Sequence, residues 1–165
     1  MSLETFNAAS PAEAAARIRP CADIDGWIDE IVAARPFSST DRALAFAASA
    51  AERWSASDVD GALAHHPRIG ERASGASAEA ELSRGEQAGL GTPSEQTASE
   101  LAAANAEYEG KFDRVFLIRA AGRSTDEILA ECRRRLGNTA EAEAVEVAVQ
   151  LREIALLRLE GVLTA

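Results

Sequence analysis

The sequence contains two histidines, which are adjacent at positions 65 and 66 in the string AHHPRIGER. Neighbouring residues on a helix point about 100° apart, so the two imidazoles are poorly placed to chelate one metal ion, and we predict no metal site. Pro67 disfavours the α conformation at His66, which places His66 where the chain leaves a helix. His66 is therefore either a simple cap of the last carbonyls or a general acid or base tuned by the helix end and a carboxylate.

A second candidate is the string 83–87, SRGEQ, which combines a hydroxyl, a carboxylate and an amide within five residues. Ser83 and Glu86 also have the spacing of a helix capping box, so they could simply begin a helix. The string AGLG that follows is a poor helix interior, because glycine costs about 1 kcal/mol relative to alanine there. The region 70–92 is thus expected to be loop and short helix, in which these polar groups would hydrogen-bond a small polar heterocycle.

Two arginines near the end of the sequence, Arg152 and Arg158, lie among apolar neighbours at helical spacing. A guanidinium cannot be neutralised by burial, so one that faces the core needs a carboxylate from the protein or from a bound ligand. The alternative is that both side chains extend along the surface into water, and periodicity does not choose between these two possibilities. We interpret the arginines at 133–135 as the basic C-terminal end of a helix, which complements the helix dipole.

The elements that must position these residues are predicted to be helices. Alanine is abundant while β-branched and aromatic residues are few, a composition that favours helix over strand. A hydroxyl three residues before a glutamate predicts helix starts at Ser10, Thr92 and Ser124. Apolar periodicity predicts helices over 24–34, 41–54, 58–65, 93–112, 124–136 and 140–163. The run VFLI at 115–118 has no obvious partner strand, so we predict an extended connection there and an all-α fold.

Length and composition limit both the architecture and the class of function. The chain has 165 residues, a length that predicts one domain over 1–165. The helical patterns predict a multi-helix bundle with a long central C-terminal helix. The net charge of the chain is −10. This charge argues against binding to nucleic acids or acidic membranes. We see neither a membrane span nor a secretory signal, and Cys21 and Cys132 are isolated, so we expect a soluble cytoplasmic protein with two buried free thiols.

A series of short strings keeps a characteristic order and spacing from about residue 24 to residue 163. The strings are Arg35-Pro36-Phe37, His66-Pro67-Arg68-Ile69-Gly70, SRGEQAGL at 83–90, Asn105-x-x-Tyr108-x-x-Lys111-Phe112, VFLI at 115–118, Gly122-Arg123-Ser124, Ile128 with Arg135-Leu136-Gly137-Asn138, Glu143, and IALLRL at 154–159. Taken together they resemble the family of 2-oxo-4-hydroxy-4-carboxy-5-ureidoimidazoline (OHCU) decarboxylases. The resemblance implies an all-helical, cofactor-free enzyme of urate degradation that yields (S)-allantoin. It also implies a homodimer whose pathway neighbours are urate oxidase and hydroxyisourate hydrolase.

The resemblance also assigns roles to individual residues. His66 matches the catalytic histidine, and Glu86 matches a catalytic carboxylate placed to orient its imidazole. The residues that match the substrate-binding positions are Pro67, Ser83, Gln87, Phe116, Leu117, Ile118, Arg119, Ala120 and Arg158. One departure is Asp113-Arg114-Val115, because the family often has Gly-Phe-Pro before the segment 116–120, whose backbone contacts the ring.

Two other functions are compatible with the same residues. The first is a decarboxylase or hydrolase that acts on a related ureido or imidazole compound, which similar pocket groups would serve. The second is a non-catalytic helical interaction module, in which His66 and Glu86 only cap helices and their mutation changes stability by about 1 kcal/mol each. Fold resemblance alone would not distinguish these functions, whereas the matching polar residues favour the decarboxylase.

Overall fold

The computed structural model describes residues 2–64, 66–70 and 78–165, and the described residues form helices and connections without a strand. The predicted all-α fold is therefore confirmed. The helices are α1 (Leu3–Ala8), α2 (Pro11–Ile18), α3 (Asp25–Ala33), α4 (Thr40–Ala51), α5 (Ala56–Leu63), α6 (Ala78–Ala88), α7 (Glu95–Phe112), α8 (Thr125–Arg135) and α9 (Ala140–Thr164). Within these ranges, no helix has the length and apolar character needed to cross a bilayer.

Two of the three predicted helix starts are confirmed by complete capping boxes. Ser10 begins α2 and Ser124 begins α8, and each hydroxyl accepts the backbone N–H of a glutamate whose carboxylate returns to the cap. The predicted start at Thr92 is wrong by two residues, because Ser94 is the N-cap of α7 and accepts the Thr97 N–H at 3.1 Å. Ser94 leads directly into a run of strong helix formers, so it takes the capping role from Thr92.

The chain divides into two compact units. Unit 1 comprises residues 1–62 and 151–165, and unit 2 comprises residues 63–150. The long C-terminal helix predicted from the sequence is α9, and its two parts contribute residues to both units. The organisation as one domain over 1–165 stays a prediction.

Unit 1 is stabilised by its two tryptophans and by one arginine that hydrogen-bonds carbonyl groups at the C-terminal end of α1. Trp27 and Trp54 stack edge to face, with ring centroids 5.8 Å apart, and the Trp27 indole N–H donates to the Ala47 carbonyl. Arg35 lies over the Phe6 ring and donates to the Phe6 and Ala9 carbonyls. These contacts hold the chain around α1, α3 and α4 in one packed arrangement.

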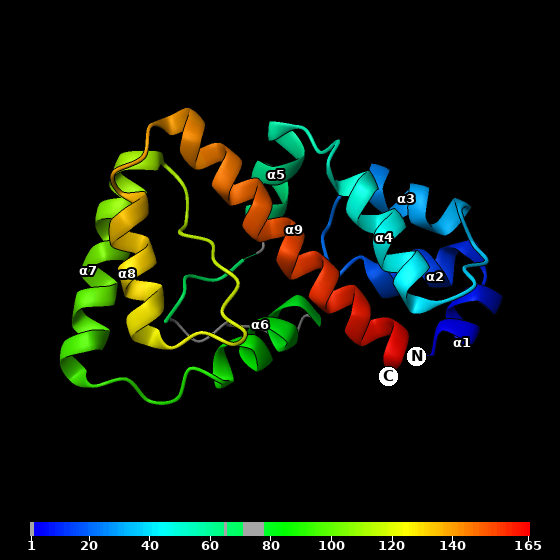
Figure 1. Ribbon diagram of the computed structural model, residues 1–165, viewed down its shortest axis with the longest axis horizontal. Helices are drawn as coiled ribbons and strands as arrows, with labels where there is room; N and C mark the ends of the chain where they lie inside the picture. Colours follow the sequence, from blue (N-terminus) through cyan, green and yellow to red (C-terminus); the bar gives the residue numbers. More distant parts are fainter. Residues whose placement is uncertain (1, 65, 71–77) are drawn as a thin grey trace. The chain divides into compact units, whose positions relative to one another are not determined.

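Unit 2 is built on α7 and α8, which pack side by side (Figure 1). Its core joins apolar residues of both helices to the extended chain between them; the members are Ile69, Leu101, Ala104, Tyr108, Phe116, Ile118, Ala120, Ile128, Leu129 and Cys132. The segment 115–120 is neither helix nor strand, which confirms the extended connection predicted for VFLI. Both cysteines are buried thiols outside any disulfide, as expected from the sequence, and burial raises the pKa of Cys132 to about 11.

Candidate active site

Three of the expected site residues lie on one face of α6. Ser83, Glu86 and Gln87 are related by steps of three and four residues, which bring side chains to the same side of a helix. Ser83 is 3% exposed, while Glu86 and Gln87 are half-buried. The short helix expected within 70–92 is present, but it begins before Ser83 and continues through Gly85 to Ala88. Ser83 and Glu86 therefore neither begin a helix nor lie in a Gly-rich loop.

The segment that follows α5 carries His66 and Pro67, both of which are half-buried. The His66 backbone N–H donates to the Leu63 carbonyl at 3.0 Å and so satisfies one of the last carbonyls of α5. His66 thus lies at the C-terminal end of a helix, as Pro67 predicts from the sequence. His65, the other histidine, lies outside the described residues.

A set of polar contacts ties the segment after His66 to α6 and α7. The Gly70 backbone N–H donates to the Gln87 side-chain oxygen at 3.0 Å, which joins this segment to the polar face of α6. Asn105 of α7 donates to the Ile69 carbonyl at 2.9 Å. Gly70 has a φ of +86°, and a Cβ there would lie 3.2 Å from a Leu101 methyl, so this close approach requires glycine.

The same segment carries an ion pair to α7. Arg68 contacts both carboxylate oxygens of Glu109, and this hydrogen-bonded guanidinium lowers the pKa of Glu109. Arg68, Ile69, Gly70 and Gln87 line a cavity of about 780 Å³ together with residues of α7 and the loop before it. Gln87 is the only expected site residue among the lining residues of this cavity.

The expected ring-contacting segment, Phe116–Ala120, is fixed by its side chains and its backbone. Phe116, Ile118 and Ala120 join the core of unit 2, whereas Leu117 and Arg119 are not members of that cluster. This alternation is the pattern of an extended chain. The Leu117 carbonyl accepts from Arg135 at 2.7 Å, and the Arg119 N–H donates to Gln150 at 2.9 Å.

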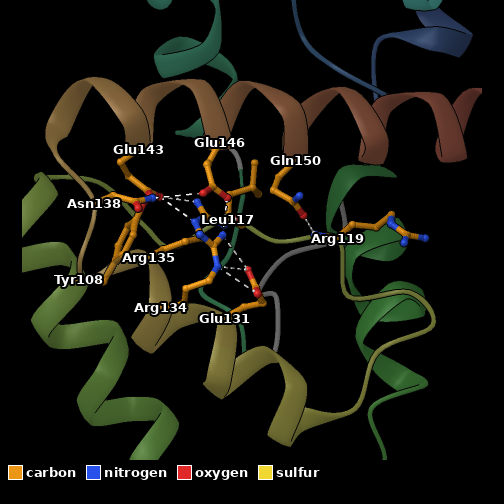
Figure 2. Close-up of polar contacts among 10 residues, drawn as sticks. All are labelled: Tyr108, Leu117, Arg119, Glu131, Arg134, Arg135, Asn138, Glu143, Glu146 and Gln150. Atoms are coloured by element: carbon orange, nitrogen blue, oxygen red, sulfur yellow. Dashed lines mark hydrogen bonds and ion pairs between the residues drawn. The ribbon is translucent and has the colours of Figure 1, made fainter.

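Arg135 belongs to a buried polar cluster that also contains Tyr108, Asn138 and Glu143 (Figure 2). Arg135 and Glu143 are each 1% exposed and form an ion pair through two guanidinium nitrogens and one carboxylate oxygen. Glu143 also accepts from the Tyr108 hydroxyl and from Asn138. Burial, and then the hydrogen bond to Glu143, raises the pKa of Tyr108 well above its usual range.

The three arginines 133–135 lie in the last turn of α8, which confirms the predicted basic end of a helix. Arg133 and Arg134 are exposed and pair with surface carboxylates, but Arg135 faces the core of unit 2. Sequence reasoning gave no role in the site to Arg135, Glu143 or Gln150. A signal for Arg135 was available, because it lies seven residues after Ile128 and three after Cys132, on the apolar stripe of α8.

Arg152 and Arg158 of α9, for which the sequence did not determine whether they face the core or the surface, differ in burial. Arg158 is 4% exposed and donates to the Pro20 carbonyl at 3.0 Å, so it is a core-facing arginine. Arg152 is half-buried, and its Nε has no hydrogen-bond partner among the described residues. Arg158 belongs to unit 1 and the other expected site residues belong to unit 2, so its place beside them stays a prediction. No three His, Cys, Asp or Glu residues form a metal-binding group in the described ranges.

Comparison with known proteins gives a family match and several similar structures, two of which follow. The sequence profile of the OHCU decarboxylase family matches residues 7–160. A crystal structure of an OHCU decarboxylase in the presence of (S)-allantoin has a TM-score of 0.74 and 24% identity, covering 88% of this chain and 95% of its own. A crystal structure of an (S)-allantoin synthase has a TM-score of 0.72 and 14% identity, covering 98% of this chain and 54% of its own. No curated protein sequence matches the chain significantly.

Proposed function

The chain belongs to the OHCU decarboxylase family, and from that membership we propose which residues carry the reaction. The family consists of carboxy-lyases that remove CO2 from OHCU to give allantoin, and this is the activity of the chain. The observation that supports the residue assignment is the Gln87–Gly70 hydrogen bond, which joins the polar face of α6 to the segment that carries His66. We place the reacting ring between these two elements.

The chemistry requires three tasks of the protein. Loss of CO2 leaves an electron pair on carbon, which the conjugated ring system of the substrate delocalises, so we expect no cofactor. The protein must hold the carboxylate, stabilise the developing charge with fixed donors and deliver a proton to one face of the ring. His66 carries out the proton transfer, because an imidazole titrates near neutral pH. Glu86 orients this imidazole or favours its charged form.

The remaining residues bind the substrate in this proposal. Ser83 and Gln87 hydrogen-bond the ureido and ring groups, and Pro67 lines the ring. Arg158 supplies the cation that an anionic substrate needs in a protein of net charge −10. The backbone of 116–120 contacts the ring from the core of unit 2. Proton delivery to one face gives the S enantiomer, in keeping with the two similar structures, an OHCU decarboxylase in the presence of (S)-allantoin and an (S)-allantoin synthase.

The test is to generate OHCU in situ from urate with urate oxidase and hydroxyisourate hydrolase and to follow circular dichroism as allantoin forms. Spontaneous decay gives racemic product, so only a catalysed reaction produces a growing signal of the S enantiomer. We expect this signal with wild type and its loss in His66→Ala at unchanged thermal stability. His65→Ala is the matched control, because it removes the other histidine of the chain.

The possible results separate the three functions. An active His66→Ala would overturn the assignment of His66. An inactive but folded wild type would favour a related ureido or imidazole substrate, which a panel of such compounds would detect. Inactivity on the whole panel, with His66 and Glu86 variants differing only in stability, would favour the helical interaction module.

We also propose that the protein is a cytoplasmic homodimer organised as one domain, on the basis of the family resemblance. Sedimentation equilibrium should then give twice the chain mass of 17.4 kDa. Both tryptophans, Trp27 and Trp54, lie in unit 1, so their fluorescence reports unit 1 alone. Unfolding of one domain should give the same urea midpoint by tryptophan fluorescence and by circular dichroism.

A further inference from the structure

We infer that Arg135 and Gln150 are positioning residues, which fix one edge of the extended segment 116–120 and leave the backbone of Ile118 to meet the substrate. This inference rests on the proposed function, in which that segment contacts the ring. It goes further by naming the residues that hold the segment and the backbone groups that it presents. Neither Arg135 nor Gln150 has a role in the family assignment carried over from the sequence.

The geometry of an extended chain separates the backbone groups of the segment into two edges. Residues two apart direct their N–H and C=O groups to the same edge, and the residue between them directs its groups to the other edge. The Leu117 carbonyl and the Arg119 N–H therefore share one edge, and the structure gives both a side-chain partner, Arg135 and Gln150 respectively. The N–H and C=O of Ile118 face the opposite edge.

The backbone of Ile118 is in an unusual position for a buried residue. Ile118 is 5% exposed, yet neither its N–H nor its C=O has a hydrogen-bond partner among the described residues. Buried backbone groups are almost always paired with protein, water or ligand, so these two groups need a partner. A ring that carries an N–H beside a C=O, as a cyclic urea does, satisfies both at once.

Arg135 is held rigidly enough to position the segment. Its Nε and Nη2 both donate to one oxygen of Glu143, and its guanidinium lies 4.6 Å from the centre of the Phe116 ring. Nη1 is thereby directed at the Leu117 carbonyl (Figure 2). Stability alone is a weak reason for such a pair, because well-packed apolar residues of similar volume are often at least as stable as a buried ion pair.

The experiment compares Arg135→Lys and Gln150→Leu with two matched controls. Lysine keeps the charge of Arg135 but loses the planar fork, and leucine removes the acceptor for the Arg119 N–H. Arg134→Lys makes the same change at the exposed neighbouring arginine, and Ile128→Val lowers stability within the same core cluster. For each variant we would measure thermal stability, kcat, KM and the enantiomeric excess of the allantoin formed from OHCU.

We expect both edge variants to lose about tenfold to a hundredfold in kcat/KM, the range caused by displacements of about an ångström at an active site. The enantiomeric excess should fall with it, since a misplaced ring presents both faces to the proton donor. In addition, (S)-allantoin should shift the Ile118 amide resonance in wild type and shift it less in Gln150→Leu. Arg134→Lys should match wild type in every measurement.

The outcomes distinguish this inference from the function on which it rests. A folded wild type that forms no excess of (S)-allantoin would overturn the proposed function. A wild type that forms it, with edge variants that behave like Ile128→Val at equal stability and keep KM and enantiomeric excess, would overturn only the positioning roles. If Arg135→Lys does not fold, Gln150→Leu decides the matter, because Gln150 is half-buried and outside the ion pair.

Discussion

Replacing Glu143 with glutamine tests whether this carboxylate compensates the buried charge of Arg135. Both side chains are 1% exposed, and Glu143 also accepts from Tyr108 and Asn138. Glutamine has nearly the same shape without the charge, so the guanidinium would stay buried without its anion. Breaking a buried pair in this way costs about 3–5 kcal/mol. Glutamine keeps one acceptor oxygen, so we expect a loss of about 3 kcal/mol in the free energy of unfolding.

Urea unfolding followed by circular dichroism at 222 nm measures this loss. For a chain of this size, about 3 kcal/mol corresponds to a fall in Tm of roughly 6–12 °C. The matched control is Glu146→Gln, since Glu146 pairs with the exposed Arg134, which keeps Glu131 as a second partner. Exposed pairs contribute about 0.2–1 kcal/mol, so the control should be close to wild type.

The reasoning is refuted if the two glutamine variants lose the same small amount of stability. A second comparison checks the cause of a large loss. In Arg135→Met combined with Glu143→Leu, both charges are removed, so much of the stability lost by Glu143→Gln should return. A double variant as unstable as the single one would show that packing, and not an uncompensated charge, determines the loss.

Three further predictions follow from single positions. Tyr108 is the one tyrosine of the sequence, and its pKa is higher in the folded protein than the value of about 10 expected in the unfolded chain. The un-ionised hydroxyl therefore stabilises the fold below pH 10, and this stabilisation is lost as the pH rises above 10. Absorbance at 295 nm should then show tyrosinate only as the protein unfolds in alkali; ionisation in the folded protein would contradict this. Cys21 and Cys132 should resist iodoacetamide at pH 8 and react fully in urea, because both are buried and the Cys132 pKa is about 11; a native thiol that reacts at once would refute it. Asp113 ends α7 with a φ of +53°, so Asp113→Gly should raise stability by about 0.5–1 kcal/mol in urea unfolding, more than Asp113→Asn, and a loss would count against the strain argument.

The parts of the fold that local chemistry determines were predictable from the sequence. The caps at Ser10 and Ser124 depend only on the next three residues, and both form as predicted. Thr92 failed because a second hydroxyl, Ser94, competes two residues later. Helix α1 was not predicted at all, since six residues carry too little periodicity to be recognised.

The parts that depend on tertiary contacts were not predictable. The apolar stripe of α8 indicates that Arg135 turns inward, but the sequence does not identify its partner, because Glu143 comes from the next helix. Gly85 and the glycines after Ala88 suggested a loop. The helix nevertheless continues through Gly85, and it places Ser83 and Glu86 on one face. The roles of His66, Glu86 and Arg158 stay predictions, which the enzymatic measurements above test.

The division of the chain has a consequence for biosynthesis. Unit 2 is one uninterrupted stretch, whereas unit 1 needs residues 1–62 together with 151–165. A ribosome therefore synthesises every residue of unit 2 before it makes the second segment of unit 1. Domains generally fold as units in the order of their synthesis, yet here the first segment to emerge must wait for the last. During that interval unit 1, whose buried apolar residues include Ile18, Trp27 and Ile31, is without its second segment, and we expect nascent chains stalled at this length to need chaperones.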